Sequence, residues 1–276
     1  MTENKQNISP DILMLGEIPE NSESDPDDLL LQTFLDIGEE MVVAGAEIWR
    51  VTDSITRMCE AYHFTRINVF IIVSNLQATV QTPEGRILTH IRCIARDDVN
   101  FDRLDYLNDL SRYICANRPD VPEMKRRLVN VMARRPQSRM VSVLGDVCAS
   151  AGFTVFFGGS PLDGAASAVM GVVLWLFLRF IQTREHNTIV RNFEASFIGG
   201  VLALLLVHIG IGQDPGVIMM GGIMLLIPGI AMTNAIRDML FGDTASGLLR
   251  LFNALIVAAA IASGFALAII LLRGVL

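Results

Sequence analysis

The feature that most constrains this chain is the apolar composition of its second half. Residues 140–276 contain no lysine and few charged side chains. A bilayer hydrocarbon core of about 30 Å requires about twenty predominantly apolar residues in a helix. Five stretches come near that length, at about 140–159, 163–182, 194–212, 215–237 and 246–271. We therefore expect an α-helical transmembrane domain with five spans over residues 138–276.

The placement of arginine predicts how these spans are oriented. Arginines cluster on one side of the predicted spans, at Arg134, Arg135, Arg139, Arg179, Arg184, Arg191, Arg237 and Arg250. The opposite loops, 158–163 and 211–216, contain neither lysine nor arginine, and Arg273 alone falls on the far side. Because positive charge is retained in cytoplasmic loops, we expect a cytoplasmic N-terminus and an external C-terminus.

The first 28 residues account for the net charge of −7. They carry a single base, Lys5, and eight acids, namely Glu3, Asp11, Glu17, Glu20, Glu23, Asp25, Asp27 and Asp28. Such a polar segment, interrupted by proline, is typical of disorder. No charge-flanked apolar segment opens the chain, so we expect no cleavable signal peptide.

Residues 29–137 show the pattern of a small α+β domain. Apolar residues recur at helical spacing from 27 to 62, where Asp27 is a candidate N-cap and Gly38 and Gly45 predict a bend or two helices. The period then changes to two over 64–74, 76–82 and 86–94, with a turn at 83–85. Two further helices are predicted over 102–116 and 121–133. We expect helices on one face of an antiparallel sheet, on the cytosolic side.

Composition argues against several kinds of chemistry. The four cysteines are Cys59, Cys93, Cys115 and Cys148; they form no CxxC pair, and we expect free, buried thiols. The four histidines show no metal-ligand spacing, so neither a metal nor another cofactor is expected. A glycine-rich phosphate loop and a nucleophile elbow are both missing from 29–137. The sequence therefore favours a protein that is not an enzyme and does not bind nucleic acid.

The fourth predicted span is interrupted. The apolar run after Gly216 lasts only to Pro228-Gly229, about 14 residues, which at helical rise is roughly 21 Å and too short to cross. Proline removes a backbone donor and disrupts the preceding turn. Transporters use such breaks to direct backbone dipoles at a substrate or a coupling ion. The alternative is a proline kink that only shapes packing.

Polar residues that could bind a substrate or ion surround this break. A group follows it at the predicted cytoplasmic join of spans four and five: Asn234, Asp238, Asp243, Arg250 and Asn253. A guanidinium can hold a carboxylate through two hydrogen bonds, and a carboxylate can hold an ammonium group or a proton. The group therefore suits a small zwitterion or a carboxylate. Asp243 as a helix cap and Arg250 as an interfacial anchor are the alternatives.

Three further residues complete the candidates. Asp146 lies about two turns into the first span, where an ionisable residue costs about 2.5–3.5 kcal/mol on insertion scales and so suggests a function; an interfacial position is the alternative. In the N-terminal domain, Glu47 and Arg50 are three residues apart on one predicted helix.

Three stretches resemble the threonine/serine exporter family, in its N-terminal part. They are GAEIWRVTDSITRM from Gly45, FFGGSPLDG from Phe156 and LIPGIAMTNAIRDMLFGDTASGLLRL from Leu226. The resemblance extends over nearly all of the chain after the acidic tail. It carries motif positions onto Glu47, Arg50, Pro228, Gly229, Asn234, Asp238, Asp243 and Gly247. Family members often have an acid where this chain has Thr52, which puts a carboxylate role at that position in doubt.

The resemblance implies a secondary transporter in the bacterial inner membrane that exports succinate, or threonine and serine, driven by the proton motive force. The layout resembles the larger subunit of a split exporter, which implies a smaller hydrophobic partner subunit; a homo-oligomer is the alternative. Glu47 and Arg50 would then gate transport or couple the domains. A membrane sensor that binds a metabolite through its N-terminal domain is the competing interpretation.

Overall fold

A computed structural model describes residues 25–72, 74–94, 99–134, 138–181 and 187–272. Its contacts divide the chain into two compact units. The first combines Met1–Arg135 with Thr233–Arg250, and the second combines Pro136–Met232 with Leu251–Leu276. The sequence predicts a boundary near residue 137, and the contacts additionally assign the short segment around residue 240 to the N-terminal unit.

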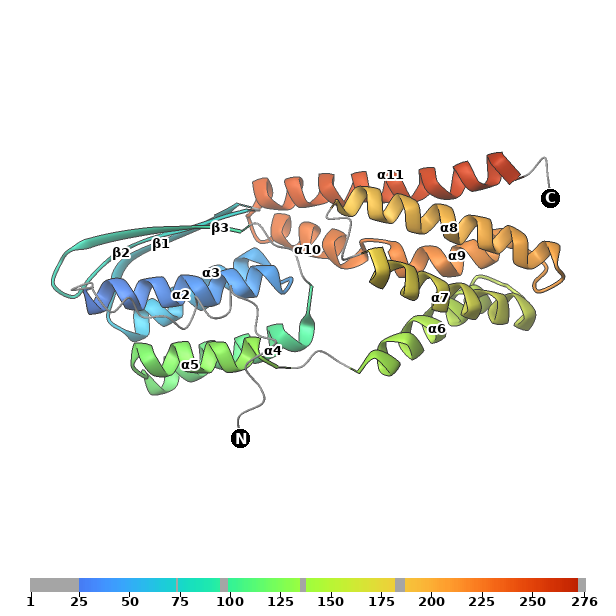
Figure 1. The fold of residues 1–276 in the computed structure, drawn as a ribbon. Helices are drawn as coiled ribbons and strands as arrows, with labels where there is room; N and C mark the ends of the chain where they lie inside the picture. Colours follow the sequence, from blue (N-terminus) through green and yellow to red (C-terminus); the bar gives the residue numbers. More distant parts are fainter. Residues whose placement is uncertain (1–24, 73, 95–98, 135–137, 182–186, 273–276) are drawn as a thin grey trace, which may run out of the picture. The chain divides into compact units, whose positions relative to one another are not determined.

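The N-terminal unit is built on a three-stranded antiparallel sheet in the order β1-β2-β3 (Figure 1). The strands are β1 (Thr65–Ile72), β2 (Asn75–Gln81) and β3 (Ile87–Cys93). Helices α2 (Pro26–Val43) and α3 (Ile48–Ala61) cover one face, and α4 (Phe101–Asn117) and α5 (Val121–Met132) pack against them. The small sheet with helices on one face, as the alternation of the sequence predicts, is confirmed.

Burial alternates along the strands as the period of two requires. Leu76, Ala78 and Val80 of β2 face the helices and are buried with the apolar side chains of α2 and α3. Phe70 and Ile91 point to the other face and are exposed. One core therefore holds the sheet and its helices together.

The two glycines of the first helical segment have different roles. Gly45 has a φ of +95° in the turn between α2 and α3, a conformation that favours glycine. Gly38 lies inside α2, where a Cβ would come within 2.6 Å of the Ile55 side chain. The chain therefore forms two helices that separate at Gly45, and Gly38 allows α3 to approach α2 closely.

The first helix begins earlier than the sequence suggests. Asp25, rather than Asp27, is the N-cap, and its carboxylate accepts a hydrogen bond from the Asp27 N–H at 3.3 Å. Pro26 occupies the first helical position, where its fixed φ suits a helix. The N–H that proline lacks would have no partner within the helix at this position.

The cysteines correct one prediction. All four are free, and Cys59 is buried; burial raises the pKa of its thiol to about 12. Cys93 and Cys148, however, are exposed. Cys93 lies at an outward position of β3, and Cys148 lies on an exposed face of a helix. Among the described residues no cluster of cysteine, histidine or acidic side chains could hold a metal ion.

The described residues of the second half form six helices in chain order. They are α6 (Arg139–Phe156), α7 (Pro161–Ile181), α8 (Thr188–His208), α9 (Pro215–Leu226), α10 (Gly229–Leu240) and α11 (Thr244–Leu272). Four of them, α6, α7, α8 and α11, are long and apolar enough to cross a membrane, and α9 with α10 makes a fifth if the bent pair is one span. The predicted five spans agree with that upper number.

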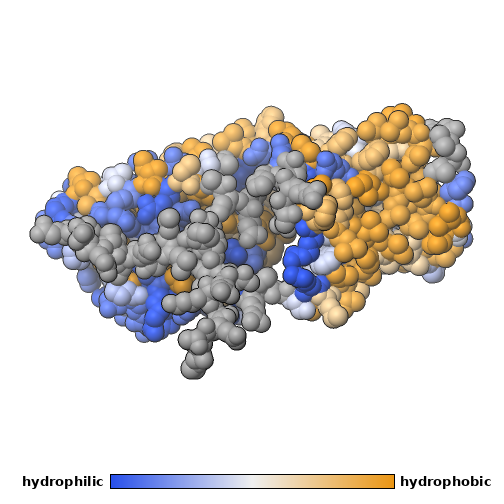
Figure 2. Space-filling model, viewed as in Figure 1, coloured by the Kyte–Doolittle hydropathy of each residue, from blue (hydrophilic) through white to orange (hydrophobic). Residues whose placement is uncertain are grey.

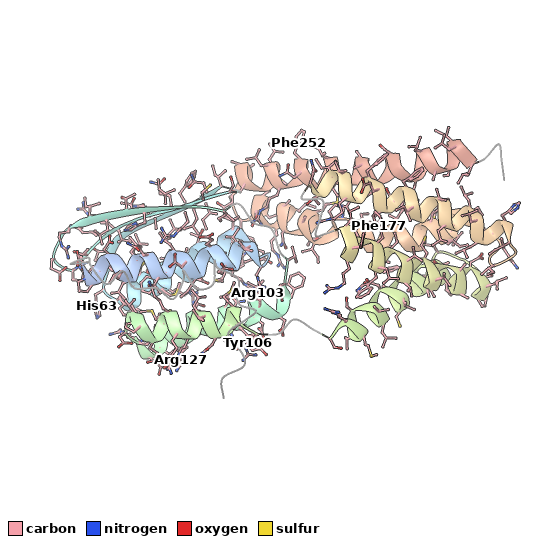
Figure 3. All side chains as sticks on the ribbon, viewed as in Figure 1. His63, Arg103, Tyr106, Arg127, Phe177 and Phe252 are labelled. Carbon is pink, nitrogen blue, oxygen red and sulfur yellow. The ribbon has the colours of Figure 1, made fainter. Side chains whose placement is uncertain are left out.

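The membrane helices have apolar side chains both on their surface and in a shared core. Met170, Leu174, Ala203 and Phe265 form part of their shared core, and Phe177 packs against it (Figure 3). Phe252 projects from α11 and is 59% exposed. Figure 2 shows that the visible surface of these helices is largely apolar. An apolar exterior over a packed interior is what a lipid solvent requires.

The predicted interruption of the fourth span is present. Helix α9 ends at Leu226, α10 begins at Gly229, and the two are bent by 55°. Pro228 has no N–H to continue the helical hydrogen bonds, and the Gly229 N–H instead bonds to the Ile227 carbonyl at 2.8 Å. Twelve residues of α9 span about 18 Å, so this helix alone cannot cross the bilayer.

A compact group of hydroxyls lies where α6, α7 and α9 meet. Ser150 Oγ and Ser167 Oγ are 2.5 Å apart, and Thr154 Oγ1 donates to the Ser150 carbonyl at 2.9 Å. A Cβ at Gly221 would lie 2.0 Å from Thr154 Oγ1 and 2.6 Å from Ser167 Oγ. Close approach through glycine, with hydroxyls bonded within and between helices, is a common way for membrane helices to associate.

We predict that Gly221→Ala destabilises the membrane helices by about 1–3 kcal/mol, the usual cost of overpacking. The measurement is thermal unfolding of the purified chain in detergent. Gly152→Ala on α6 is the matched control, because no atom lies within 4 Å of a Cβ at that position. Equal melting temperatures for the two variants would contradict this packing account.

Candidate functional site

The turn between α2 and α3 leaves backbone groups that need partners. The N-cap position of α3 is Glu47, whose side chain makes no capping hydrogen bond. The first N–H groups of a helix have no partner within the helix. The Ile48 N–H instead donates to Oδ1 of Asp238 at 3.0 Å, 190 residues further along the chain. A carboxylate from α10 therefore caps the start of α3.

Two carbonyl groups of the same turn are also bonded by distant side chains. Asn234 Nδ2 donates to the Gly45 carbonyl at 3.0 Å, and Arg250 Nη1 donates to the Ala46 carbonyl at 3.3 Å. We call the set of Glu47, Asn234, Arg237, Asp238 and Arg250, together with the backbone of 45–48, the clamp.

The charges of the clamp balance, with two carboxylates and two guanidinium groups. Arg250 Nη1 lies 3.2 Å from Oδ2 of Asp238, which is fully buried. Arg237 Nη1 bonds to Oε1 of Glu47. Glu47 Oε2 is also buried but has no hydrogen-bond partner within the described residues. Removing one partner of a buried pair is strongly destabilising, because the other charge is then left uncompensated.

Helix geometry explains why α10 can supply three of these groups. Asn234, Arg237 and Asp238 are spaced i, i+3 and i+4, so they share one face of the helix. Gly247 allows the start of α11 to approach this helix, because a Cβ there would lie 2.6 Å from the Ala235 carbonyl. That approach lets Arg250 reach Asp238.

Two further contacts hold the same segment to the N-terminal unit. Ser246 Oγ, at the start of α11, donates to the Ile71 carbonyl at the end of β1, at 2.9 Å. The Trp49 and Phe241 rings stack with centroids 4.8 Å apart. The segment is therefore fixed to α3 and to the sheet.

The structure brings together only part of the predicted group. Glu47, Asn234, Asp238 and Arg250 meet in the clamp, where they bond to one another and to the turn. Asp243 lies half-buried just before α11, and Arg50 is exposed on α3. The remaining candidates belong to the second unit: Asp146, Pro228, Gly229 and Asn253.

Sequence reasoning missed Arg237 and Ser246 as members of this site. Arg237 was assigned only to the flank of a span, although its spacing from Asn234 is the signal that places both on one face. Nothing in the local pattern indicates Ser246, since its partner is a backbone carbonyl of a strand.

A second buried carboxylate, Asp163, organises two loops between membrane helices. Its Oδ2 accepts hydrogen bonds from the N–H and the Oγ of Ser160, at 2.9 and 2.8 Å. Its Oδ1 accepts from the N–H groups of Gln213 and Asp214, at 2.5 and 3.1 Å. These bonds tie the turn before α7 to the loop before α9. The sequence offers this residue only as part of the FFGGSPLDG stretch.

We predict that Asp238→Asn destabilises the N-terminal unit by about 3–5 kcal/mol, the usual cost of leaving one member of a buried pair uncompensated. The asparagine amide can still accept from Ile48, but its NH₂ group would face the Arg250 guanidinium. The measurement is urea unfolding followed by Trp49 fluorescence in a Trp175→Phe background.

Asp243→Asn is the control for this prediction, because Asp243 makes no side-chain hydrogen bond or ion pair among the described residues and asparagine caps helices as well as aspartate does. If both variants unfold at the same urea concentration, Asp238 is not the buried cap described here.

Comparison with known proteins identifies the family of the chain. The family described as "Putative threonine/serine exporter" matches residues 32–272. A relative from Mycobacterium tuberculosis, named "Probable threonine/serine exporter", is 26% identical over 260 residues, which cover 90% of this chain and 47% of the relative. The chain thus spans about half the length of this curated relative. No solved structure gives a significant match. The chain belongs to the threonine/serine exporter family.

Proposed function

We propose that this chain is one component of a secondary transporter that exports small hydrophilic metabolites, and that the clamp couples its N-terminal domain to the transport helices. The observation that carries the proposal is the buried set of bonds from α10 and α11 to the α2–α3 turn. Helix α10 begins directly after Pro228, so a change at the break would reach the turn through this helix. Family membership supports the transporter role.

The substrates we propose are threonine and serine, with succinate as the alternative. The proposal rests on the name of the family and of the relative, and on polar side chains of the membrane helices. Asp146 on α6 and Asn253 on α11 are the candidates in the membrane helices. In the described parts of the chain, the Asp146 carboxylate has no hydrogen-bond or ion-pair partner, which leaves it available to a substrate ammonium group or a proton.

We propose that Glu47 carries the proton that couples transport to the proton motive force. One of its oxygens bonds to Arg237, and the other is buried without a partner among the described residues. Protonation would neutralise the carboxylate and weaken its attraction to Arg237. The clamp would loosen as a result, and α10 could shift relative to α3. The clamp would then be a two-state element that a single proton biases.

The orientation we propose places the N-terminal domain in the cytoplasm and the protein in the inner membrane. The support is the arginine asymmetry, since Arg139, Arg191 and Arg237 flank one set of helix ends and the loops 158–163 and 211–216 lack positive charge. An exporter with this orientation would meet its substrate on the side of the clamp.

We further propose a second, smaller hydrophobic component that packs against α6. Only 11% of the apolar window of α6 is buried, compared with 28–39% for the other long membrane helices. Gly145 and Gly152 lie two turns apart on this helix, and a Cβ at either would meet no atom within 4 Å. Small residues on an uncovered face allow another helix to approach closely. The relative is also about twice as long as this chain, because the match covers 47% of it.

We predict that Glu47→Arg abolishes export, because it replaces the Arg237 pair with two adjacent positive charges. The double variant Glu47→Arg/Arg237→Glu should recover a measurable part of the rate by restoring opposite charges. The measurement is uptake of labelled threonine, serine and succinate into inside-out membrane vesicles. Glu60→Arg, at an exposed position of the same helix, should transport normally. A double variant no better than Glu47→Arg would contradict the coupling role of this pair.

We also predict that the purified chain, reconstituted alone into liposomes, gives no proton-driven threonine, serine or succinate flux. Native membrane vesicles, assayed in parallel, provide the positive control. Proton-driven flux of any of these substrates into liposomes that contain only this polypeptide would contradict the proposal of a second component.

A further inference from the structure

A pocket of about 540 Å³ lies in the N-terminal unit between α3 and α4, apart from the clamp. Its volume falls within the range of about 300–1,000 Å³ that is typical of small-molecule sites. It is lined by Trp49, Arg50, Asp53, Ser54, Arg57, Asn108, Ser111, Arg112, Cys115 and Ala116.

The lining is strongly basic. The lining contains three guanidinium groups, from Arg50, Arg57 and Arg112, and one carboxylate, from Asp53. Its charged side chains therefore carry an excess of two positive charges. Arg50, Ser54 and Arg57 follow helical spacing along α3, so they share the face that lines the pocket.

The existing ion pairs leave these arginines available. Arg57 bonds to Asp53 at 2.9 Å and Arg112 to Asp109 at 3.3 Å, but both guanidinium groups are about 70% exposed, at 68% and 74%. Exposed pairs of this kind contribute little and exchange readily. Arg50 is exposed and has no ion-pair partner among the described residues. A bound anion can therefore form hydrogen bonds with all three arginines without breaking a buried contact.

Neutral groups of the lining can add further hydrogen-bond donors. The Ser54 hydroxyl and the Asn108 amide can donate to an anion. Trp49 forms part of the wall, and its Nε1 is buried without a hydrogen-bond partner in the part of the chain that the structure describes. The lining therefore offers hydrogen-bond donors together with positive charge.

We propose that this pocket binds a small anion with two negative charges, either a dicarboxylate or a phosphate group. Paired arginines recognise both through charge-assisted, bidentate hydrogen bonds. A zwitterionic amino acid fits less well, because its ammonium group would face the guanidinium groups. Trp49 lines the pocket, stacks on Phe241 and is two residues from Glu47 of the clamp. An anion in the pocket would therefore contact a residue next to the clamp.

The test uses the full chain in detergent, with Trp175→Phe so that Trp49 is the single tryptophan. Inorganic phosphate, succinate, acetate and threonine are titrated, with Trp49 fluorescence and isothermal titration calorimetry as readouts. We expect saturable binding of phosphate or succinate that weakens as salt rises, and no saturable binding of acetate or threonine in the same range. The tighter of the two dianions identifies the class of anion.

Arg50→Gln and Arg112→Gln should each weaken this binding at least tenfold, whereas Arg126→Gln should leave it unchanged. Arg126 is a matched control because it lies on α5, is 71% exposed and does not line the pocket. The proposal is overturned if neither dianion gives a signal or heat. It is also overturned if threonine alone binds, or if the three arginine variants bind the dianion equally well.

Discussion

One buried carboxylate joins the two segments of the chain that make up the N-terminal unit. Asp238 supplies the cap that α3 lacks, and it simultaneously holds Arg250, which bonds to the carbonyl just before the helix. Without Asp238, the first N–H of α3 and the Arg250 guanidinium would both be buried without their acceptor. Such groups carry their full desolvation penalty. A single side chain from the second half of the chain thus completes a helix in the first half.

This dependence makes the clamp better suited to positioning than to stability. A buried ion pair gains little over a well-packed apolar contact, but it accepts few alternative geometries. Glu47 and Arg237 add a second pair whose carboxylate is incompletely bonded. In the proposed coupling role, the fully bonded pair would maintain the contact and the incompletely bonded pair would respond to a change in charge. Transporters need this combination, because their domains must stay attached while the pathway changes shape.

Local patterns in the sequence predict the elements but not their long-range partners. The change from helical spacing to a period of two locates the strands, and Pro228-Gly229 locates the break. Asn234, Asp238 and Arg250 stand out as polar residues in an apolar region, so their proximity is also predictable. Their partners are backbone groups of residues 45–48, between 189 and 204 positions away. A backbone carbonyl or N–H has no sequence signature, so the sequence does not reveal that these side chains bond to the α2–α3 turn.

The central claim is that the clamp changes state during transport, and hydrogen exchange at the start of α3 measures it most directly. The Ile48 amide is protected by its bond to Asp238, so its exchange rate reports whether the clamp is closed. In membranes that actively export threonine under a proton gradient, the account predicts faster exchange at Ile48 than in the same membranes without substrate or gradient. Exchange at Leu107, in the core of the same unit, should stay constant. Identical protection of Ile48 in resting and actively transporting membranes would contradict the account.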